Sequence, residues 1–232
     1  MIMKIFSLEN DIIFKEEYIN VLQIQDKKLF TNVINSLNDN INNIEDTKER
    51  IIILDNDIEI KIEKEVLMII DVFNIDFNQK KIQSALYNKI EKIYKQEFER
   101  MSEFQTIFQK LQLNVLDVFN EFLFEFNYKE SIGIQEHLKL LGLKISNNKG
   151  KIIDTVFSLI DVVEYLSVAK LLVFVNLKLY LSDDELNEIH KYAMYKKVNI
   201  LLIETGEEKE PLENEKILYI DSDYDEIVLY NK

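Results

Sequence analysis

The sequence Leu-Leu-Val-Phe-Val at positions 171–175 decides the fold class, because five apolar residues in a row fit a strand that is buried on both faces. A second such run extends from Val198 to Ile203. A helical pattern precedes the first run, from Ile153 to Val168, and another separates the two, from Asp183 to Tyr195. Strands of this kind between helices predict a mostly parallel sheet with helices on both faces.

A helix-capping motif and two short terminal strands support the same assignment. Ser182 and Glu185 form a capping box, which predicts that the helix begins at Asp183. Two further short strands are expected near the C-terminus, Ile217 to Ile220 and Ile227 to Tyr230. The predicted fold class is therefore α/β.

The first part of the chain adds a helix and a hairpin. Leu29, Val33 and Leu37 have helical spacing, and the Asn-rich stretch at 38–43 ends that helix. Ile51 to Leu54 and the alternating segment 58–62 read as two strands joined by the turn at 55–57.

Helical periodicity takes over from Asn78. Apolar residues recur every three or four positions up to Leu111, which predicts one long helix, with further helices at about 114–126 and 135–141. The sequence thus predicts an α/β head of residues 1–76 and 149–232, with an inserted α-helical leg of residues 77–148. Two alternatives stay open for the leg: an intramolecular helical bundle, or a surface that forms an oligomer.

Composition limits the class of protein. The chain has 232 residues, of which 47% are hydrophobic, and a net charge of −14. Zero cysteines exclude disulfides, a thiol nucleophile and cysteine-based zinc sites. The apolar stretches are shorter than the roughly 20 residues of a membrane helix, and the first 14 residues do not resemble an export signal. A soluble, cytoplasmic protein with no membrane association is expected.

A phosphate-binding loop is not found. Gly150-Lys151 resembles the end of such a loop, but Ile152 replaces the Ser or Thr that holds magnesium, and Ile145 replaces the first glycine. The strand at 171–175 ends in Asn176, where ATPases of this type have an acid. ATP hydrolysis is therefore not expected.

Carboxylates are the remaining chemical feature. Asp117, Glu121 and Glu125 are spaced by four residues, so on the expected helix they would form one acidic stripe. Glu130 and Glu136 follow, and oxygen ligands of this kind suit calcium. The alternative is an acidic, solvated helix face. The two histidines, His137 and His190, are isolated in the sequence and are expected to be packing or surface residues.

Basic residues gather in three short stretches despite the acidic net charge. These are Lys80-Lys81, Lys139 to Lys151, and Lys191 to Lys197. Local lysine density determines the affinity for phosphates, so an acidic protein can carry one DNA-binding surface. Taken singly, each stretch is equally a solvated run of charge.

Several motifs together resemble a known family. The run Lys170 to Asn176, then Tyr180-Leu-Ser182, Glu185-Leu186 and Asn199 to Glu204, resembles the C-terminal part of the type II-A CRISPR spacer-acquisition proteins that form DNA-encircling rings. Upstream, the acid-rich helix and the Lys139-Leu-Leu-Gly-Leu-Lys144 segment occur in the same order as in that family, and the similarity extends to Val66 to Asn74.

The resemblance implies a degenerate P-loop ATPase-like head and a helical leg, assembled as a homotetramer with a lysine-lined hole for the end of a DNA duplex. It implies calcium bound by Glu121, Glu125, Glu130 and Glu136, and DNA-facing lysines at Lys139, Lys144, Lys149 and Lys151. It also implies action with the CRISPR integrase subunits and the interference nuclease. Leu123, Asn127 and Lys129 depart from the acids of the family's calcium-binding helix, which reduces the number of ligands.

Three functions are compatible with these observations. The first is a non-enzymatic clamp that binds double-stranded DNA ends without sequence preference during spacer acquisition in antiviral defence. The alternative enzyme is a metal-dependent nuclease of the same system that uses the carboxylates. A DNA-free oligomeric scaffold is the third.

Overall fold

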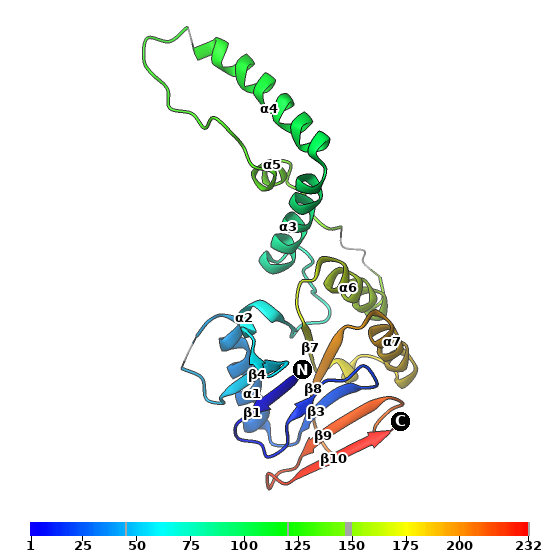
Figure 1. The fold of residues 1–232 in the computed structure, drawn as a ribbon. Helices are drawn as coiled ribbons and strands as arrows, with labels where there is room; N and C mark the ends of the chain where they lie inside the picture. Colours follow the sequence, from blue (N-terminus) through cyan, green and yellow to red (C-terminus); the bar gives the residue numbers. More distant parts are fainter. Residues whose placement is uncertain (45, 120, 147–149, 232) are drawn as a thin grey trace. The chain divides into compact units, whose positions relative to one another are not determined.

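The computed structural model describes residues 1–44, 46–119, 121–146 and 150–231 (Figure 1). The chain divides into two compact units. We call Met1–Asp76 together with Asn147–Lys232 the head, and Phe77–Ser146 the leg. In the described part of the chain, no helix combines the length and the apolar character needed to cross a membrane.

A six-stranded sheet organises the head, in the order β10-β9-β3-β8-β7-β6. Five of its strands are parallel, and only the edge strand β10 runs antiparallel to its neighbour. The strands are β3 (Ile19–Ile24), β6 (Val66–Ile69), β7 (Leu171–Val175), β8 (Asn199–Thr205), β9 (Glu215–Ile220) and β10 (Glu226–Asn231). The predicted α/β class with a mostly parallel sheet is therefore confirmed.

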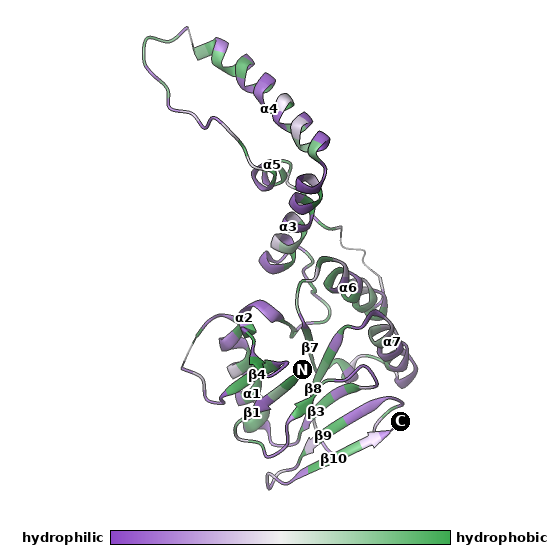
Figure 2. Ribbon diagram, viewed as in Figure 1, coloured by the Kyte–Doolittle hydropathy of each residue, from purple (hydrophilic) through white to green (hydrophobic). Residues whose placement is uncertain are grey.

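Layers cover both faces of this sheet (Figure 1). On one side lie α1 (Lys27–Ile41) and a four-stranded sheet in the order β2-β1-β4-β5. Alternate residues of the large sheet, such as Leu22, Val173 and Leu201, share one core with Val33 of α1. On the other side are α6 (Ile152–Leu166) and α7 (Asp183–Lys196), whose buried residues include Leu159, Ile160 and Ile189; α6 is mostly hydrophobic along the ribbon in Figure 2. The small sheet consists of β1 (Ile2–Ile5), β2 (Ile12–Ile13), β4 (Ile51–Asp55) and β5 (Ile58–Glu59).

Three elements of the head can be compared with the prediction. The second strand of the hairpin has only two residues, and residues 62–65 form the helical turn α2 (Ile62–Glu65). The central strand β3 was not predicted, because the buried polar residues Asn20 and Gln23 interrupt its apolar pattern. The capping box is confirmed: the Ser182 backbone N–H donates to Glu185, 2.9 Å away, and the Glu185 N–H donates to the Ser182 hydroxyl.

The leg contains α3 (Lys80–Gln96), α4 (Phe98–Phe119) and α5 (Ile134–Leu140). The predicted single helix up to Leu111 is wrong, because the backbone is extended at Glu97. This break lets Phe104 of α4 contact Tyr94 of α3 and His137 of α5, at ring distances of 6.1 and 5.3 Å. Phe104 and Tyr94 pack against a small core of Tyr87, Ile134 and Leu138.

The predicted helix at 114–126 is also wrong. Its first residues belong to α4, which ends at Phe119, and residues 121–133 form no regular element. The sequence explains the difference, since Phe122, Phe124, Phe126 and Tyr128 recur with a period of two rather than 3.6.

Candidate functional site

The first parallel strand of the head lacks the phosphate loop that follows such a strand in P-loop ATPases. That loop has the form strand–GxxxxGK[ST]–helix, and its backbone N–H groups hold phosphate at the start of the helix. Here β3 reaches α1 through only Gln25 and Asp26. The Asp26 carboxylate accepts the Leu29 N–H at 2.7 Å and so caps α1 itself. A carboxylate in this position repels phosphate.

Gln25 holds the same turn closed. Its side-chain oxygen accepts the Tyr219 hydroxyl at 2.8 Å and the Ser222 N–H at 3.2 Å. Gly150-Lys151, the pair compared with a phosphate loop from the sequence, precedes α6 instead, where Asp154 accepts the Lys151 N–H. The connection between β3 and α1, where a P-loop ATPase would have its phosphate loop, is therefore Gln25–Asp26, which sequence motifs alone did not reveal.

Asn176, at the carboxyl end of β7, has a structural role. It adopts a left-handed conformation, with φ of 56°. Its side-chain oxygen accepts the Thr205 N–H at 3.1 Å, and its own N–H donates to the Ile203 carbonyl at 2.9 Å. Both groups join β7 to β8, so we interpret Asn176 as a structural residue; its neutral amide also lacks the charge that a carboxylate would offer a metal.

A cluster of ionisable side chains is buried inside the head. Lys178 donates to both oxygens of Glu215, at 2.9 and 2.8 Å, and these side chains are only 6% and 0% exposed. Glu215 also accepts the Leu212 N–H at 2.9 Å. Glu204 accepts the Lys178 N–H at 3.1 Å, and burial raises the pKa of Glu204 to about 7. The cluster is shielded from solvent, so we interpret it as a structural ion pair.

His190 of α7 packs against this ion pair. Its Nε2 lies 3.6 Å from a Glu215 oxygen, and neither ring nitrogen has a hydrogen-bond partner in the structure. Burial lowers the pKa of His190 to about 4, which leaves the ring neutral at neutral pH. No sequence motif pointed to this cluster, because its members are far apart along the chain.

The predicted calcium ligands are not brought together by a single chain. Glu121, Glu125 and Glu130 are exposed in the irregular segment after α4, so the expected acidic stripe on one helix face does not form. Glu136 is engaged by Lys129 and by the Gly133 N–H, which lowers the pKa of Glu136. Among the residues that the structure describes, no three acidic or histidine side chains converge as a metal site. Calcium binding at these residues therefore stays a prediction, and within the described part of one chain they do not form a shared site.

Three of the four predicted DNA-binding lysines are exposed. Lys139 lies in α5 and Lys144 follows it in the leg, whereas Lys151 is at the start of α6 in the head. Within the described ranges, Lys139 and Lys144 form no ion pair within 4 Å, although Lys139 is near enough to Glu136 to help lower its pKa. Lys149 lies outside the described residues.

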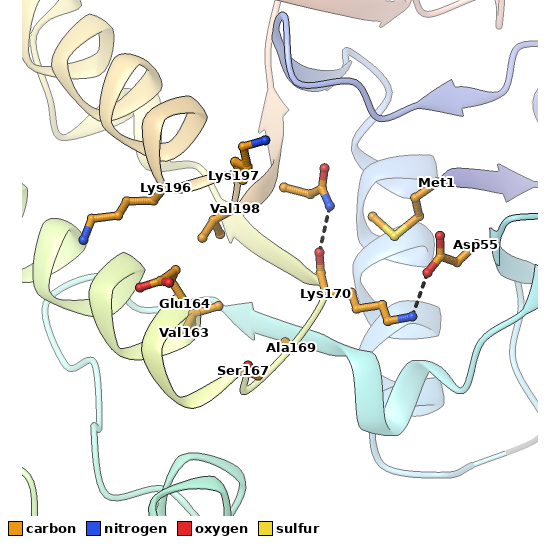
Figure 3. A pocket seen from close by; sticks show the side chains of 11 residues that line it. Met1, Asp55, Val163, Glu164, Ser167, Ala169, Lys170, Lys196, Lys197 and Val198 are labelled. Carbon is orange, nitrogen blue, oxygen red and sulfur yellow. Dashed lines mark hydrogen bonds and ion pairs between the residues drawn. The ribbon is translucent and has the colours of Figure 1, made fainter. Parts of the chain in front are cut away.

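The head has a cavity of about 320 Å³ at the amino ends of β7 and β8 (Figure 3). Lys170 forms an ion pair with Asp55 at 2.6 Å inside it. Lys196 and Lys197 also line the cavity, but they pair with Asp161 and Glu16, and Figure 3 shows their amino groups pointing apart. Since each lysine is neutralised by a carboxylate, the cavity is not a phosphate site.

Comparisons with known proteins agree on one family. Residues 43–224 match the family model of the CRISPR-associated protein Cas_Csn2. The CRISPR-associated protein Csn2 of Enterococcus faecalis is 27% identical over 143 residues, which cover 60% of this chain and 64% of that protein. Csn2 of Streptococcus agalactiae is 27% identical over 146 residues, covering 60% and 63%. The chain thus matches less than two thirds of the length of these relatives.

A solved structure has a similar fold. The crystal structure of Stu0660 of Streptococcus thermophilus has a TM-score of 0.63 to this chain, with 12% sequence identity, covering 100% of this chain and 77% of the other. The family model spans more than half of the chain, and its strands, from β4 to β9, include four of the five parallel strands. The chain therefore belongs to the Csn2 family of type II-A CRISPR-associated proteins.

Proposed function

We propose that this chain is a non-enzymatic clamp for double-stranded DNA ends, which acts without sequence preference in CRISPR spacer acquisition. The observation that carries the proposal is the pair of exposed lysines, Lys139 and Lys144, for which the described residues form no carboxylate ion pair, in a chain of net charge −14. By contrast, the lysines around the cavity at β7 and β8 in the head are neutralised. Unpaired lysines are the groups that release counterions from DNA.

The absence of a phosphate loop after β3 supports a binding role over an ATP-driven one. The helix start that would hold phosphate is capped by Asp26.

A ring-shaped homotetramer is part of the proposal, and the surface of α4 supports assembly. Ile107, Leu111, Val115 and Val118 are exposed and, at helical spacing, share one face of α4; an exposed apolar helix face is typical of an interface.

Calcium binding at Glu121, Glu125, Glu130 and Glu136 stays a prediction, and the proposed clamp does not depend on it. Partners in this proposal are double-stranded DNA, other copies of the chain, and the integrase subunits and interference nuclease of the same CRISPR system.

The test is binding of a labelled linear duplex as salt is raised from about 0.05 to 0.2 M, where DNA-binding proteins that neutralise several phosphates lose orders of magnitude in affinity. Lys139→Ala/Lys144→Ala should weaken binding for every sequence and reduce the slope of log K against log salt by about 0.9 for each phosphate that is no longer neutralised. Lys95→Ala is the matched control, because Lys95 is also exposed in the leg but pairs with Glu91 at 2.8 Å.

Two results would contradict the proposal. A closed circular duplex that competes as well as a linear duplex of the same sequence would exclude recognition of ends. DNA cleavage in magnesium or manganese that Glu121→Ala abolishes would favour the nuclease instead.

A further inference from the structure

The turn that follows α5 is fixed by its own backbone. Gly142 is left-handed, with φ of 62°, and its N–H donates to the Lys139 carbonyl at 3.0 Å. The next N–H, that of Leu143, donates to the Leu138 carbonyl at 3.3 Å. These two bonds define a Schellman motif, which ends a helix at a glycine. Because the Leu143 side chain also packs against the leg core that contains Leu138, the chain leaves α5 in one defined direction.

Two side chains of the leg hold the segment immediately after this turn. The side-chain amide of Asn78 pairs with the backbone of Ile145: its oxygen accepts the Ile145 N–H at 2.8 Å, and its nitrogen donates to the Ile145 carbonyl at 3.0 Å. The hydroxyl of Tyr87, a residue of the leg core, donates to the Leu143 carbonyl at 3.3 Å. Both sequence neighbours of Lys144 are thus held by side chains from the beginning of the leg.

Lys144 lies between these two anchored residues. It is exposed, whereas Leu143 and Ile145 are half-buried. Where a chain buries both neighbours of a residue, the side chain between them faces outward, as it does along a strand. A lysine on a fixed backbone has only its own side chain to order when it meets an anion. Less entropy therefore opposes binding than for a lysine on a freely moving chain.

We propose that Asn78 is a positioning residue, which holds Lys144 so that its ammonium group meets a phosphate of the DNA backbone. This inference rests on the proposed function for the identity of the ligand. Asn78 acts through the backbone of Ile145, and Tyr87 supports the same segment at Leu143. A side-chain amide suits this role because it offers a donor and an acceptor, which match the C=O and the N–H of a single residue.

The test is a double-mutant cycle on the full chain, with a labelled linear duplex at salt concentrations from about 0.05 to 0.2 M. Lys144→Ala should lower the slope of log K against log salt by about 0.9 for each phosphate that is no longer neutralised, which amounts to about 3.5-fold in affinity over this range. Asn78→Ala should reproduce most of this change. The variant that combines both substitutions should bind like Lys144→Ala alone, because the amide acts only through the lysine.

A matched control and a second readout separate positioning from general stability. Asn88→Ala removes another side-chain hydrogen bond across the leg, to Gln135 at 2.9 Å, and should bind the duplex like the unmodified chain. In Asn78→Ala, the Ile145 amide should exchange its hydrogen about tenfold faster, while α3 and α5 keep their protection. Tyr87→Phe keeps the ring and removes only the hydroxyl, so it carries the same test if Asn78→Ala disturbs those helices.

Three results would overturn the inference. The first is duplex binding by Asn78→Ala that equals that of the control. The second is an effect of Asn78→Ala that adds in full to that of Lys144→Ala, which would assign Asn78 to stability alone. The third is unchanged hydrogen exchange at Ile145. If Lys144→Ala weakens duplex binding and Asn78→Ala does not, only the positioning role is refuted, whereas an unmodified chain that binds no duplex refutes the clamp as well.

Discussion

Two buried groups in the head should titrate with opposite effects on stability. The folded state lowers the pKa of His190 from 6.5 to about 4, chiefly through burial, while Glu215 beside it acts to raise it and Lys178 to lower it. It raises the pKa of Glu204 from 4.5 to about 7, again chiefly through burial, against the opposing effects of Lys178 and Lys209 and with a contribution from Glu215. The two groups titrate in overlapping ranges of pH.

The signs follow from proton uptake. His190 has a lower pKa in the folded state, so its contribution to stability is present above pH 6.5 and is lost as the pH falls toward 4. Glu204 has a higher pKa in the folded state, so its contribution is present below pH 4.5 and is lost as the pH rises through 7. Each shift corresponds to roughly 3 kcal/mol at its limit. In the unmodified chain the two effects should largely cancel between pH 6.5 and 4.5.

Single substitutions should separate the two effects. Glu204→Gln keeps an oxygen for the Lys178 N–H and removes the Glu204 titration, so the free energy of unfolding, relative to the unmodified chain, should fall by about 1.4 kcal/mol per pH unit between pH 7 and pH 4.5. His190→Leu removes two unpartnered ring nitrogens and the His190 titration, so its stability relative to the unmodified chain should rise as the pH is lowered from 6.5 toward 4.

Urea denaturation followed by circular dichroism at several pH values measures these differences. Other carboxylates, such as Asp161, whose pKa is lowered by Lys196 and Tyr192 despite an opposing effect of burial, titrate alike in all three proteins and drop out of the comparison. Three pH profiles that run parallel, within about 0.5 kcal/mol, would refute the assignment of buried, opposed titrations.

Three further predictions concern single interactions. Lys178→Met should lower the free energy of unfolding by about 3–5 kcal/mol, because it leaves the fully buried Glu215 carboxylate without its cation, and adding Glu215→Leu should recover most of this loss in urea denaturation. Asp26→Ala should lower stability by about 1 kcal/mol through loss of the helix cap, and a fluorescent ATP analogue should still not bind, because the turn lacks a phosphate loop. Calcium binding at the predicted carboxylates would raise the melting temperature in scanning fluorimetry. The Glu121→Gln/Glu125→Gln variant should lose that rise, whereas the control Glu103→Gln, in α4, should keep it.

The sequence was sufficient for the fold class but not for the centre of the sheet. Continuous apolar runs at β7 and β8 predicted buried parallel strands, and this is what the structure contains. The strand β3 is just as buried, but it includes Asn20, whose side chain donates to the Ile13 carbonyl at 3.1 Å. Hydrogen bonds that satisfy a buried amide are tertiary interactions, so a hydrophobic pattern cannot foresee them.

The errors in the leg have a different cause. The break at Glu97 carries no glycine or proline, and the apolar period continues across it. Tertiary packing of Phe104 against Tyr94 and His137 stabilises the interruption between α3 and α4, and that packing is not a local property of the sequence. The end of α4 was predictable, since the aromatic residues after it change to a period of two.

The polar and charged side chains of the head and of the leg differ in whether they already have partners within the chain. In the head, polar groups at the ends of the strands are satisfied internally: Asp26 caps α1, Asn176 joins two strands, and Lys178 neutralises Glu215. In the leg, Lys139 and Lys144 lack carboxylate ion pairs among the described residues, and Phe122 and Phe124 after α4 are exposed. Because binding energy comes from groups that the fold has not already paired, the leg is where substitutions should alter DNA and partner binding, and substitutions at the polar groups of the head should alter stability.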